Sequence, residues 1–342
     1  MDSVGWGKLG IYLMWVLSAQ EGIHFFSPQL TQHPLRYSPD STGANPMSET
    51  ALPSTRVPFS AIVDRPRLTV PDGGRMLVWI IVNVEHWTME RAMPRTVLSP
   101  PMGQPLQPDL PNWAWHEYGM RVGFWRILDA LKNLNIVPTL AINGVVCESY
   151  PRVASAALDL GWEFMGHGYV QGPMHALADQ RASIAQTVSA IKAFTGKAPV
   201  GWESPGLTET NDTIDHLAEA GIEYVADWVF DDQPVWIKAK PRPVLSVPYS
   251  VEINDIPMML LQSHSGAELY ERGVAQLDRL WQESETIPRV MAISVHPYIT
   301  GAPHRIAQFE RLLAYAQSKT GVVIKTGAQI NDWYRAQVPA PL

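Results

Sequence analysis

Apolar runs and helix-patterned segments alternate along this chain from about residue 76 to the C-terminus. Residues 76–85 form a continuous apolar run rich in β-branched side chains, which is typical of a strand buried on both faces of a parallel sheet. Residues 117–134 instead carry apolar side chains at helical spacing, and residues 136–142 are the next apolar run. About seven such strand-then-helix units follow one another, which predicts an α/β fold with a parallel sheet covered by helices.

The later elements continue this alternation. Strands are predicted at residues 162–165, 199–203, 222–226, 243–251, 289–295 and 322–324, and helices at residues 151–160, 177–194, 211–220, 267–282, 305–317 and 328–334. The Pro-rich stretch 88–115 lacks either pattern, and a loop of this length in a compact domain usually serves as a functional lid or cover.

The N-terminal segment differs from the rest of the chain. Residues 9–19 are apolar but too few to span a bilayer, and residues 22–50 are rich in Pro, Ser and Thr, a composition typical of disorder. Three interpretations stay open: translation starts at Met47, the apolar stretch is an export signal, or the segment binds a partner. We expect a disordered or targeting segment over residues 1–50, one catalytic domain over residues 51–342, and a cytoplasmic protein unless the signal is real.

Charge and cysteine content narrow the class of function. The net charge is −7 with no run of Lys or Arg, which argues against a nucleic-acid or anionic-membrane surface and favours a small-molecule substrate. The single cysteine, Cys147, excludes an internal disulfide and a cysteine-cluster metal site, and its apolar neighbours predict a buried thiol. We expect no stable membrane insertion, and the sequence is compatible with a homo-oligomer.

Three histidines, His86, His167 and His296, each follow a predicted strand. In a parallel α/β barrel the carboxyl ends of the strands form the rim where active sites are built. Carboxylates lie at the same rim, Glu85 beside the first histidine and Glu203 after the strand at 199–203. Hydrolysis of an amide needs an activated water, an oxyanion stabiliser and an acid for the leaving nitrogen, and these side chains could supply them.

The order of these motifs resembles the polysaccharide deacetylase superfamily, and within it the allantoinase-like and cyclic-imide-hydrolase-like branch. The motifs are NVEH at residues 83–86, GWEFMGHG at 161–168, GWE at 201–203 and SVH at 294–296, with YGMRVG at 118–123 and VPY at 247–249 followed by Asn254 and Asp255. The likeness covers roughly residues 56–333. It implies an irregular (β/α) barrel of the polysaccharide deacetylase type, with about seven parallel strands.

The resemblance also implies roles for site residues. Glu85 stands in the position of the catalytic base, His86 in that of a metal ligand, and His296 in that of the acid that protonates the leaving amine. His167 matches the first of two family histidines spaced four apart, but Gln171 occupies the second position. Glu203 stands where the family has an arginine that orients the base.

Two accounts of the chemistry follow from these departures. In one, His86, His167 and Glu203 hold a divalent metal, which we expect to be zinc, that activates a water. In the other, Glu85 and a pair of histidines handle the proton transfers without an ion. The sequence leaves both open.

Aromatic side chains near the rim are expected to line the substrate pocket. They are Trp87, Tyr169, Trp202 and Trp228. A pocket of this kind suits a flat cyclic or aryl-bearing amide, so we expect a hydrolase of non-peptide C–N bonds acting on a small cyclic or linear amide or ureide. An N-deacetylase of amino-sugar polymers and a non-catalytic carbohydrate-binding relative are the alternatives.

Overall fold

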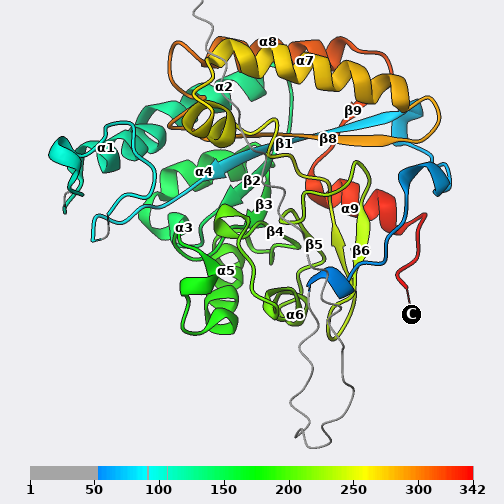
Figure 1. Ribbon diagram of the computed structural model, residues 1–342, viewed down its shortest axis with the longest axis horizontal. Coiled ribbons are helices and arrows are strands. Elements are labelled where there is room, and N and C mark those ends of the chain that lie inside the picture. The colour runs from blue at the N-terminus through cyan, green and yellow to red at the C-terminus, as the bar shows by residue number, and fades with distance from the viewer. Residues whose placement is uncertain (1–52, 91, 106, 342) are drawn as a thin grey trace, which may run out of the picture. The chain divides into compact units, whose positions relative to one another are not determined.

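The computed structural model describes residues 53–90, 92–105 and 107–341 (Figure 1). The expectations for the N-terminal segment fall on residues outside this range. Within the described part of the chain, none of the helices combines the length and apolar composition that a membrane span requires. The predicted alternation of strands and helices is present, except that three strands follow one another without a helix over residues 224–246.

One curled sheet forms the centre of the fold. Its strands are β1 (Met76–Val84), β2 (Thr139–Ile142), β3 (Glu163–Gly166), β4 (Gly201–Trp202), β5 (Tyr224–Val225), β6 (Val235–Ile237), β7 (Val244–Ser246), β8 (Arg289–Val295) and β9 (Val322–Ile324). They run in the order β6-β7-β5-β4-β3-β2-β1-β8, with β9 also paired to β1. The sequence predicted about seven parallel strands and missed β6, which is short and antiparallel to β7. The predicted parallel barrel is otherwise confirmed, as an open curled sheet.

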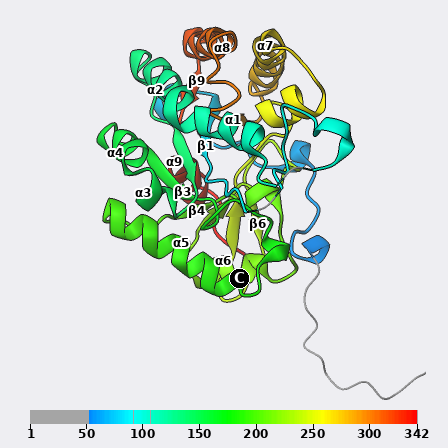
Figure 2. The same cartoon turned by 90° about the vertical axis from the view of Figure 1, so that its left-hand side faces the viewer.

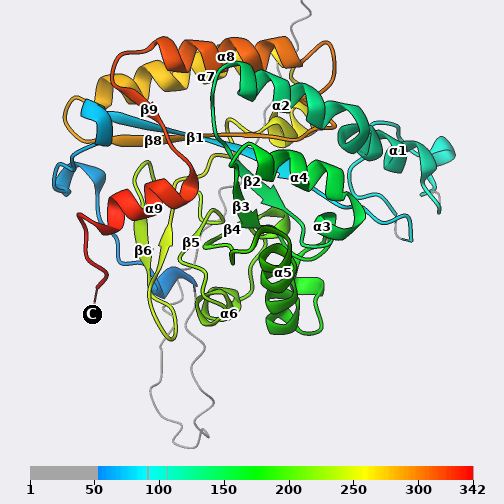
Figure 3. The ribbon, with the colours of Figure 1, turned by 180° about the vertical axis from the view of Figure 1, so that it is seen from behind.

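Helices surround the sheet on its outer side (Figure 2), except α9, which lies at the amino end of the sheet. They are α1 (Leu110–Tyr118), α2 (Phe124–Asn133), α3 (Val146–Ser149), α4 (Pro151–Asp159), α5 (Gln180–Thr195), α6 (Thr213–Glu219), α7 (Gly266–Glu283), α8 (Ile306–Ser318) and α9 (Gly327–Arg335), with π-helical turns η5 (Gly119–Gly123) and η8 (Ile256–Leu261). Helices α7 and α8 lie side by side along β1 and β8 (Figures 1 and 3). The stretch 88–115 is not wholly a loop, because α1 begins at Leu110 with the Asp109 side chain as its N-cap.

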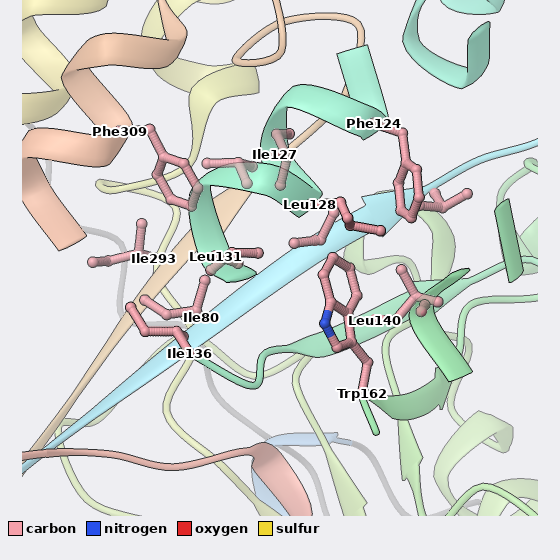
Figure 4. Packing of buried hydrophobic residues seen from close by; sticks show 14 of the residues in the cluster. Ile80, Phe124, Ile127, Leu128, Leu131, Ile136, Leu140, Trp162, Ile293 and Phe309 are labelled. Atoms are coloured by element: carbon pink, nitrogen blue, oxygen red, sulfur yellow. The ribbon is translucent and has the colours of Figure 1, made fainter. Parts of the chain in front are cut away.

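Side chains of β1 alternate between two hydrophobic cores, as the period of two in a strand requires. Met76, Val78 and Ile80 belong to the outer core under the helices, whereas Leu77 and Trp79 belong to a second core inside the curled sheet. Figure 4 shows part of the outer core, where α2 packs between the sheet and α8; its labelled residues include Ile80, Ile127, Leu131, Leu140 and Phe309. The same alternation decides which rim residues face inward.

The amino end of the sheet is closed by α9. The buried carboxylate of Glu163 in β3 accepts hydrogen bonds from Thr139 Oγ1 (2.7 Å), Tyr224 Oη (2.7 Å) and the backbone N–H of Ala328 (3.0 Å). Because the N-terminal N–H groups of a helix lack partners within the helix, a carboxylate placed there is stabilising. Glu163 therefore joins three strands to the C-terminal helix, far from the opposite rim.

Candidate active site

Four charged or titratable side chains from different strands meet inside the carboxyl rim of the sheet. Glu85 and His296 continue the inward alternation of β1 and β8, while His167 and Glu203 follow β3 and β4. All are nearly inaccessible to solvent, with exposed fractions of 7%, 4%, 2% and 4%. Segments up to 211 residues apart in the chain, such as Glu85 and His296, are therefore in contact at one site.

Glu85 is at the centre of this group. Its Oε1 lies 3.5 Å from His296 Nε2 and 3.6 Å from His167 Nε2. Oε1 also accepts a hydrogen bond from Gln171 Nε2 (2.8 Å), and Oε2 accepts one from Trp87 Nε1 (3.0 Å). Burial acts to raise the pKa of Glu85, but the neighbouring His296 and His167 outweigh it and hold this pKa well below its usual range. Glu85 is a carboxylate at neutral pH.

His296 is oriented by a buried aspartate, Asp255. Oδ1 of Asp255 lies 2.7 Å from His296 Nδ1, and Oδ2 accepts hydrogen bonds from the His296 backbone N–H (2.7 Å) and from Thr300 Oγ1 (2.6 Å). Burial lowers the pKa of His296, whereas Asp255 and Glu85 raise it, to about 9. Nδ1 therefore carries a proton directed at Asp255, and Nε2 points to Glu85. No role for Asp255 was predicted from the sequence, although the Asn254-Asp255 pair was part of the resemblance.

His167 is held by the backbone of the next strand. Its Nδ1 lies 2.7 Å from the carbonyl oxygen of Glu203, which fixes the proton on Nδ1 and leaves Nε2 facing Glu85. Both flanking positions require glycine. A Cβ on Gly166 would lie 2.6 Å from the Trp202 ring, and Gly168 has a φ of +72°, a left-handed conformation that favours glycine. Burial lowers the pKa of His167, but Glu85 and Glu203 raise it overall.

Glu203 has one carboxylate oxygen engaged and one buried without a partner. Oε1 accepts from Tyr249 Oη (3.1 Å), which also contacts Ser294 Oγ (2.7 Å), while Oε2 has no hydrogen-bond partner among the described residues. Burial raises the pKa of Glu203 to about 7; Asp227 also raises it, and His167 opposes the rise. Glu203 thus lies within the site and holds a proton more readily than Glu85 does.

The residues proposed as metal ligands do not assemble into a ligand set. His86 follows Glu85 and so faces the opposite side of β1, where its Nδ1 lies 3.2 Å from Ser149 Oγ and its ring packs against Tyr150. Gln171, in the position of the second family histidine, bonds to Glu85. Over the described residues, no group of three His, Cys, Asp or Glu side chains is placed to hold a metal ion. The expected set of His86, His167 and Glu203 therefore does not fit a metal in this structure.

The four aromatic residues expected in the pocket occupy different places. Trp87 lies at the site through its bond to Glu85, and Tyr169 is half-buried beside Gly144. Trp202 is fully buried in a core beneath α5 and α6, because it faces outward from β4, so the expectation that it lines the pocket is corrected. Trp228 lines a separate cavity of about 1220 Å³ that reaches Tyr249 but not Glu85, His167 or His296.

The segment between β1 and α1 covers the site. Asn112 fixes this segment, because its Oδ1 accepts from the backbone N–H groups of Val97 (2.8 Å) and Leu98 (3.0 Å). Arg95 Nη1 then reaches Tyr298 Oη at 3.2 Å and Glu85 Oε1 at 3.8 Å. The segment thus contributes a cation to the site, which the sequence had not suggested.

Close packing behind the site explains the YGMRVG motif. A Cβ on Gly119 would lie 2.7 Å from the Tyr298 backbone nitrogen, and one on Gly123 would lie 2.0 Å from the Pro297 carbonyl oxygen. Only glycine permits η5 to approach the segment after His296 this closely. Gly119 and Gly123 therefore position the loop that carries His296, whereas the Arg121 side chain between them is exposed and pairs with Glu117.

Comparisons with known proteins agree with this fold. Residues 115–225 match the family model described as polysaccharide deacetylase. A Schizosaccharomyces pombe protein named "Putative polysaccharide deacetylase" is 27% identical over 65% of this chain and 76% of its own length. A Helicobacter pylori peptidoglycan deacetylase is 24% identical over 64% of this chain and 85% of its own length. These matches confirm the resemblance inferred from the motifs.

A solved structure described as PuuE allantoinase is similar in fold and sequence. It superposes with a TM-score of 0.74 at 26% identity, over 83% of this chain and 99% of its own. This relative therefore shares the barrel fold that the sequence predicts.

Proposed function

From the premise that this chain carries a polysaccharide deacetylase domain of a C–N hydrolase family, we propose that it hydrolyses a non-peptide C–N bond in a small cyclic or linear amide or ureide. One observation supports this most strongly: the Glu85 carboxylate lies within 3.6 Å of Nε2 of both His167 and His296, in a nearly solvent-free site. The similarity to an allantoinase over most of both chains agrees with a small substrate.

The charge states suit general acid–base hydrolysis at neutral pH. Glu85 accepts a proton from a water whose oxygen attacks the amide carbonyl carbon, and the C=O electron pair moves onto the carbonyl oxygen. When this pair returns, the C–N bond breaks and the leaving nitrogen takes the proton from His296 Nε2. The products are a carboxylic acid and an amine. Because the pKa of His296 is raised to about 9 while that of Glu85 is lowered, both begin in the required protonation state.

Gln171 and Asp255 act as positioning residues. The Gln171 amide donates to Glu85 Oε1 while its own oxygen accepts from Asn143 Nδ2 (3.0 Å), so its orientation is fixed. Asp255 holds His296 through a buried pair of hydrogen bonds. Since the predicted metal ligands do not converge, the proposed proton transfers involve only protein side chains and water.

The test is a substrate panel of cyclic imides, ureides and N-acetylated amino-sugar oligomers, assayed for released acid or amine. We expect turnover of a cyclic imide or ureide, abolished in Glu85→Gln. An Arg121→Ala variant is a suitable control, because that side chain is 74% exposed and pairs with Glu117. Turnover of acetylated oligomers alone would instead support a polymer deacetylase, the activity named for the Helicobacter pylori relative.

A further inference from the structure

Arg95 is placed within the site by contacts on three sides. Its Nη1 donates to Tyr298 Oη at 3.2 Å and lies 3.8 Å from Glu85 Oε1, and its guanidinium carbon lies 5.7 Å from the centre of the Trp87 ring. Its side chain is 24% exposed, compared with 2% for that of Glu85. Arg95 therefore lies between the buried carboxylate of Glu85 and the solvent.

The segment that carries Arg95 is fixed on both sides of it. Beyond Arg95, Asn112 bonds the backbone of Val97 and Leu98, and its Nδ2 donates to the Leu98 carbonyl oxygen at 3.0 Å. Before it, Trp113 Nε1 donates to the Trp87 carbonyl oxygen at 3.1 Å. These bonds tie the segment to α1, so the backbone that carries the Arg95 side chain is held in place.

Arg95 keeps unused hydrogen-bond donors. A guanidinium has five N–H groups, and within the described ranges Arg95 makes one hydrogen bond, to Tyr298. The histidines near Glu85 each use Nδ1 in a hydrogen bond, His296 to Asp255 and His167 to the Glu203 carbonyl, and each directs Nε2 at Glu85. Among the described cations near Glu85, Arg95 is thus the one that keeps several donors free.

Attack of water on an amide leaves a negative charge on the carbonyl oxygen, which needs a fixed positive group or donors. The Arg95 guanidinium, with its positive charge and its free N–H donors beside Glu85, can supply both. We infer that Arg95 is a catalytic residue whose guanidinium binds the carbonyl oxygen of the scissile amide and stabilises the oxyanion. This inference rests on the proposed hydrolase function and assigns a role to the segment between β1 and α1.

A structural role makes different predictions. If Arg95 only anchored its segment or neutralised Glu85, its loss would lower the melting temperature or change substrate affinity, and a soluble cation would not repair it. If it stabilises an oxyanion, its loss should lower kcat more than it changes KM, because the charge develops only in the transition state.

The experiment compares Arg95→Ala, Arg95→Lys and the control Arg121→Ala with the wild-type protein, using an amide found active in the panel. We expect kcat of Arg95→Ala to fall about 100- to 1000-fold with little change in KM, a smaller loss in Arg95→Lys, and unchanged melting temperatures. Millimolar guanidinium chloride should raise the rate of Arg95→Ala but not that of the wild type or of Arg121→Ala.

Each outcome has a defined meaning. Wild-type activity in Arg95→Ala, a loss seen in KM alone, or a loss in kcat that neither guanidinium nor lysine relieves would overturn the inference while leaving the proposed function intact. Absence of turnover by the wild type on every amide would overturn the proposed function and the role of Arg95 with it.

Discussion

Replacing Asp255 with Asn tests the proposed acid directly. The change removes a charge and keeps the size of the side chain. Oδ2 of Asp255 accepts two hydrogen bonds, from the His296 backbone N–H and from Thr300 Oγ1, so this position must keep an oxygen. The amide NH₂ of Asn would then face His296 Nδ1. Because this NH₂ group is only a donor, it cannot accept a hydrogen bond from a proton on Nδ1. The neutral imidazole would have to carry its proton on Nε2.

The expected size of the effect follows from the pKa of His296. The rise from 6.5 to about 9 corresponds to about 3 kcal/mol of preference for the charged imidazole, achieved against the burial that lowers it. Without the Asp255 charge, we expect this pKa to fall toward or below 6.5. At about pH 8 an imidazole of pKa 6.5 would be protonated in only about 3% of the molecules, so kcat/KM should fall about 30-fold, and further if the pKa falls below 6.5.

Two assays measure this change. In the pH profile of kcat/KM, the alkaline limb of the wild type should lie near pH 9, where His296 loses its proton, and should move to lower pH in Asp255→Asn. The second assay needs no substrate. Because the pKa of His296 is raised in the folded state, its pairing adds stability below pH 6.5 that is lost as pH rises through about 9. The difference in unfolding free energy between wild type and variant should therefore shrink over that interval.

The control is Asp159→Asn, a change in an exposed side chain at the end of α4. The reasoning would be refuted if Asp255→Asn kept both the alkaline limb and the pH dependence of unfolding of the wild type. It would also be refuted if imidazole signals in an NMR titration of the two proteins gave the same pKa for His296.

Three further predictions concern the base, the metal and the amino end of the sheet. Glu85→Gln should lower kcat on the order of 100-fold or more without loss of fold, as measured by steady-state assay and circular dichroism; near-normal turnover would remove Glu85 from the mechanism. Dialysis against a chelator should leave kcat unchanged, because His86 faces away from His167; a loss restored by zinc would contradict this. Glu163→Ala should lower the free energy of unfolding by about 3 kcal/mol in urea titrations, since Thr139, Tyr224 and Ala328 lose a buried acceptor, while the exposed-site control Glu310→Ala should not; equal stability of the two would refute the role of Glu163.

The sequence predicted the order of elements and the four central site residues, Glu85, His167, Glu203 and His296, because both depend on local pattern. Buried strands are recognisable in the sequence as apolar runs, and polar residues directly after such a strand lie at the rim of the sheet. The separation of Glu85 from His86 was also available in principle, since adjacent residues in a strand face opposite sides. The metal-ligand expectation for His86 followed from its position in the family motif, which carries no information on the side that the residue faces.

Other features could not be found by local pattern. Asp255 and Arg95 reach the site through contacts with residues 41 and 203 positions away in the chain, His296 and Tyr298. Asp255 belongs to the motifs of the resemblance and Arg95 to the predicted cover, but nothing in the local sequence shows that Asp255 pairs with His296 or that Arg95 lies beside Glu85. Strand β6 has only three residues and exists because it pairs with β7, so tertiary contact rather than propensity creates it.

The position of β1 in the sheet has a consequence for biosynthesis. This wholly buried strand pairs on one side with β8, and on the other with β2 over its later residues and with β9 over its first three. Two of these neighbours, β8 and β9, are synthesised long after β1, since β1 ends at Val84 and β8 begins at Arg289. Until then a nine-residue apolar strand exposes an unpaired edge, which is a hazard for aggregation. Production in soluble form should therefore respond to chaperone supply and to slower synthesis at low temperature more than to the stability of the finished protein.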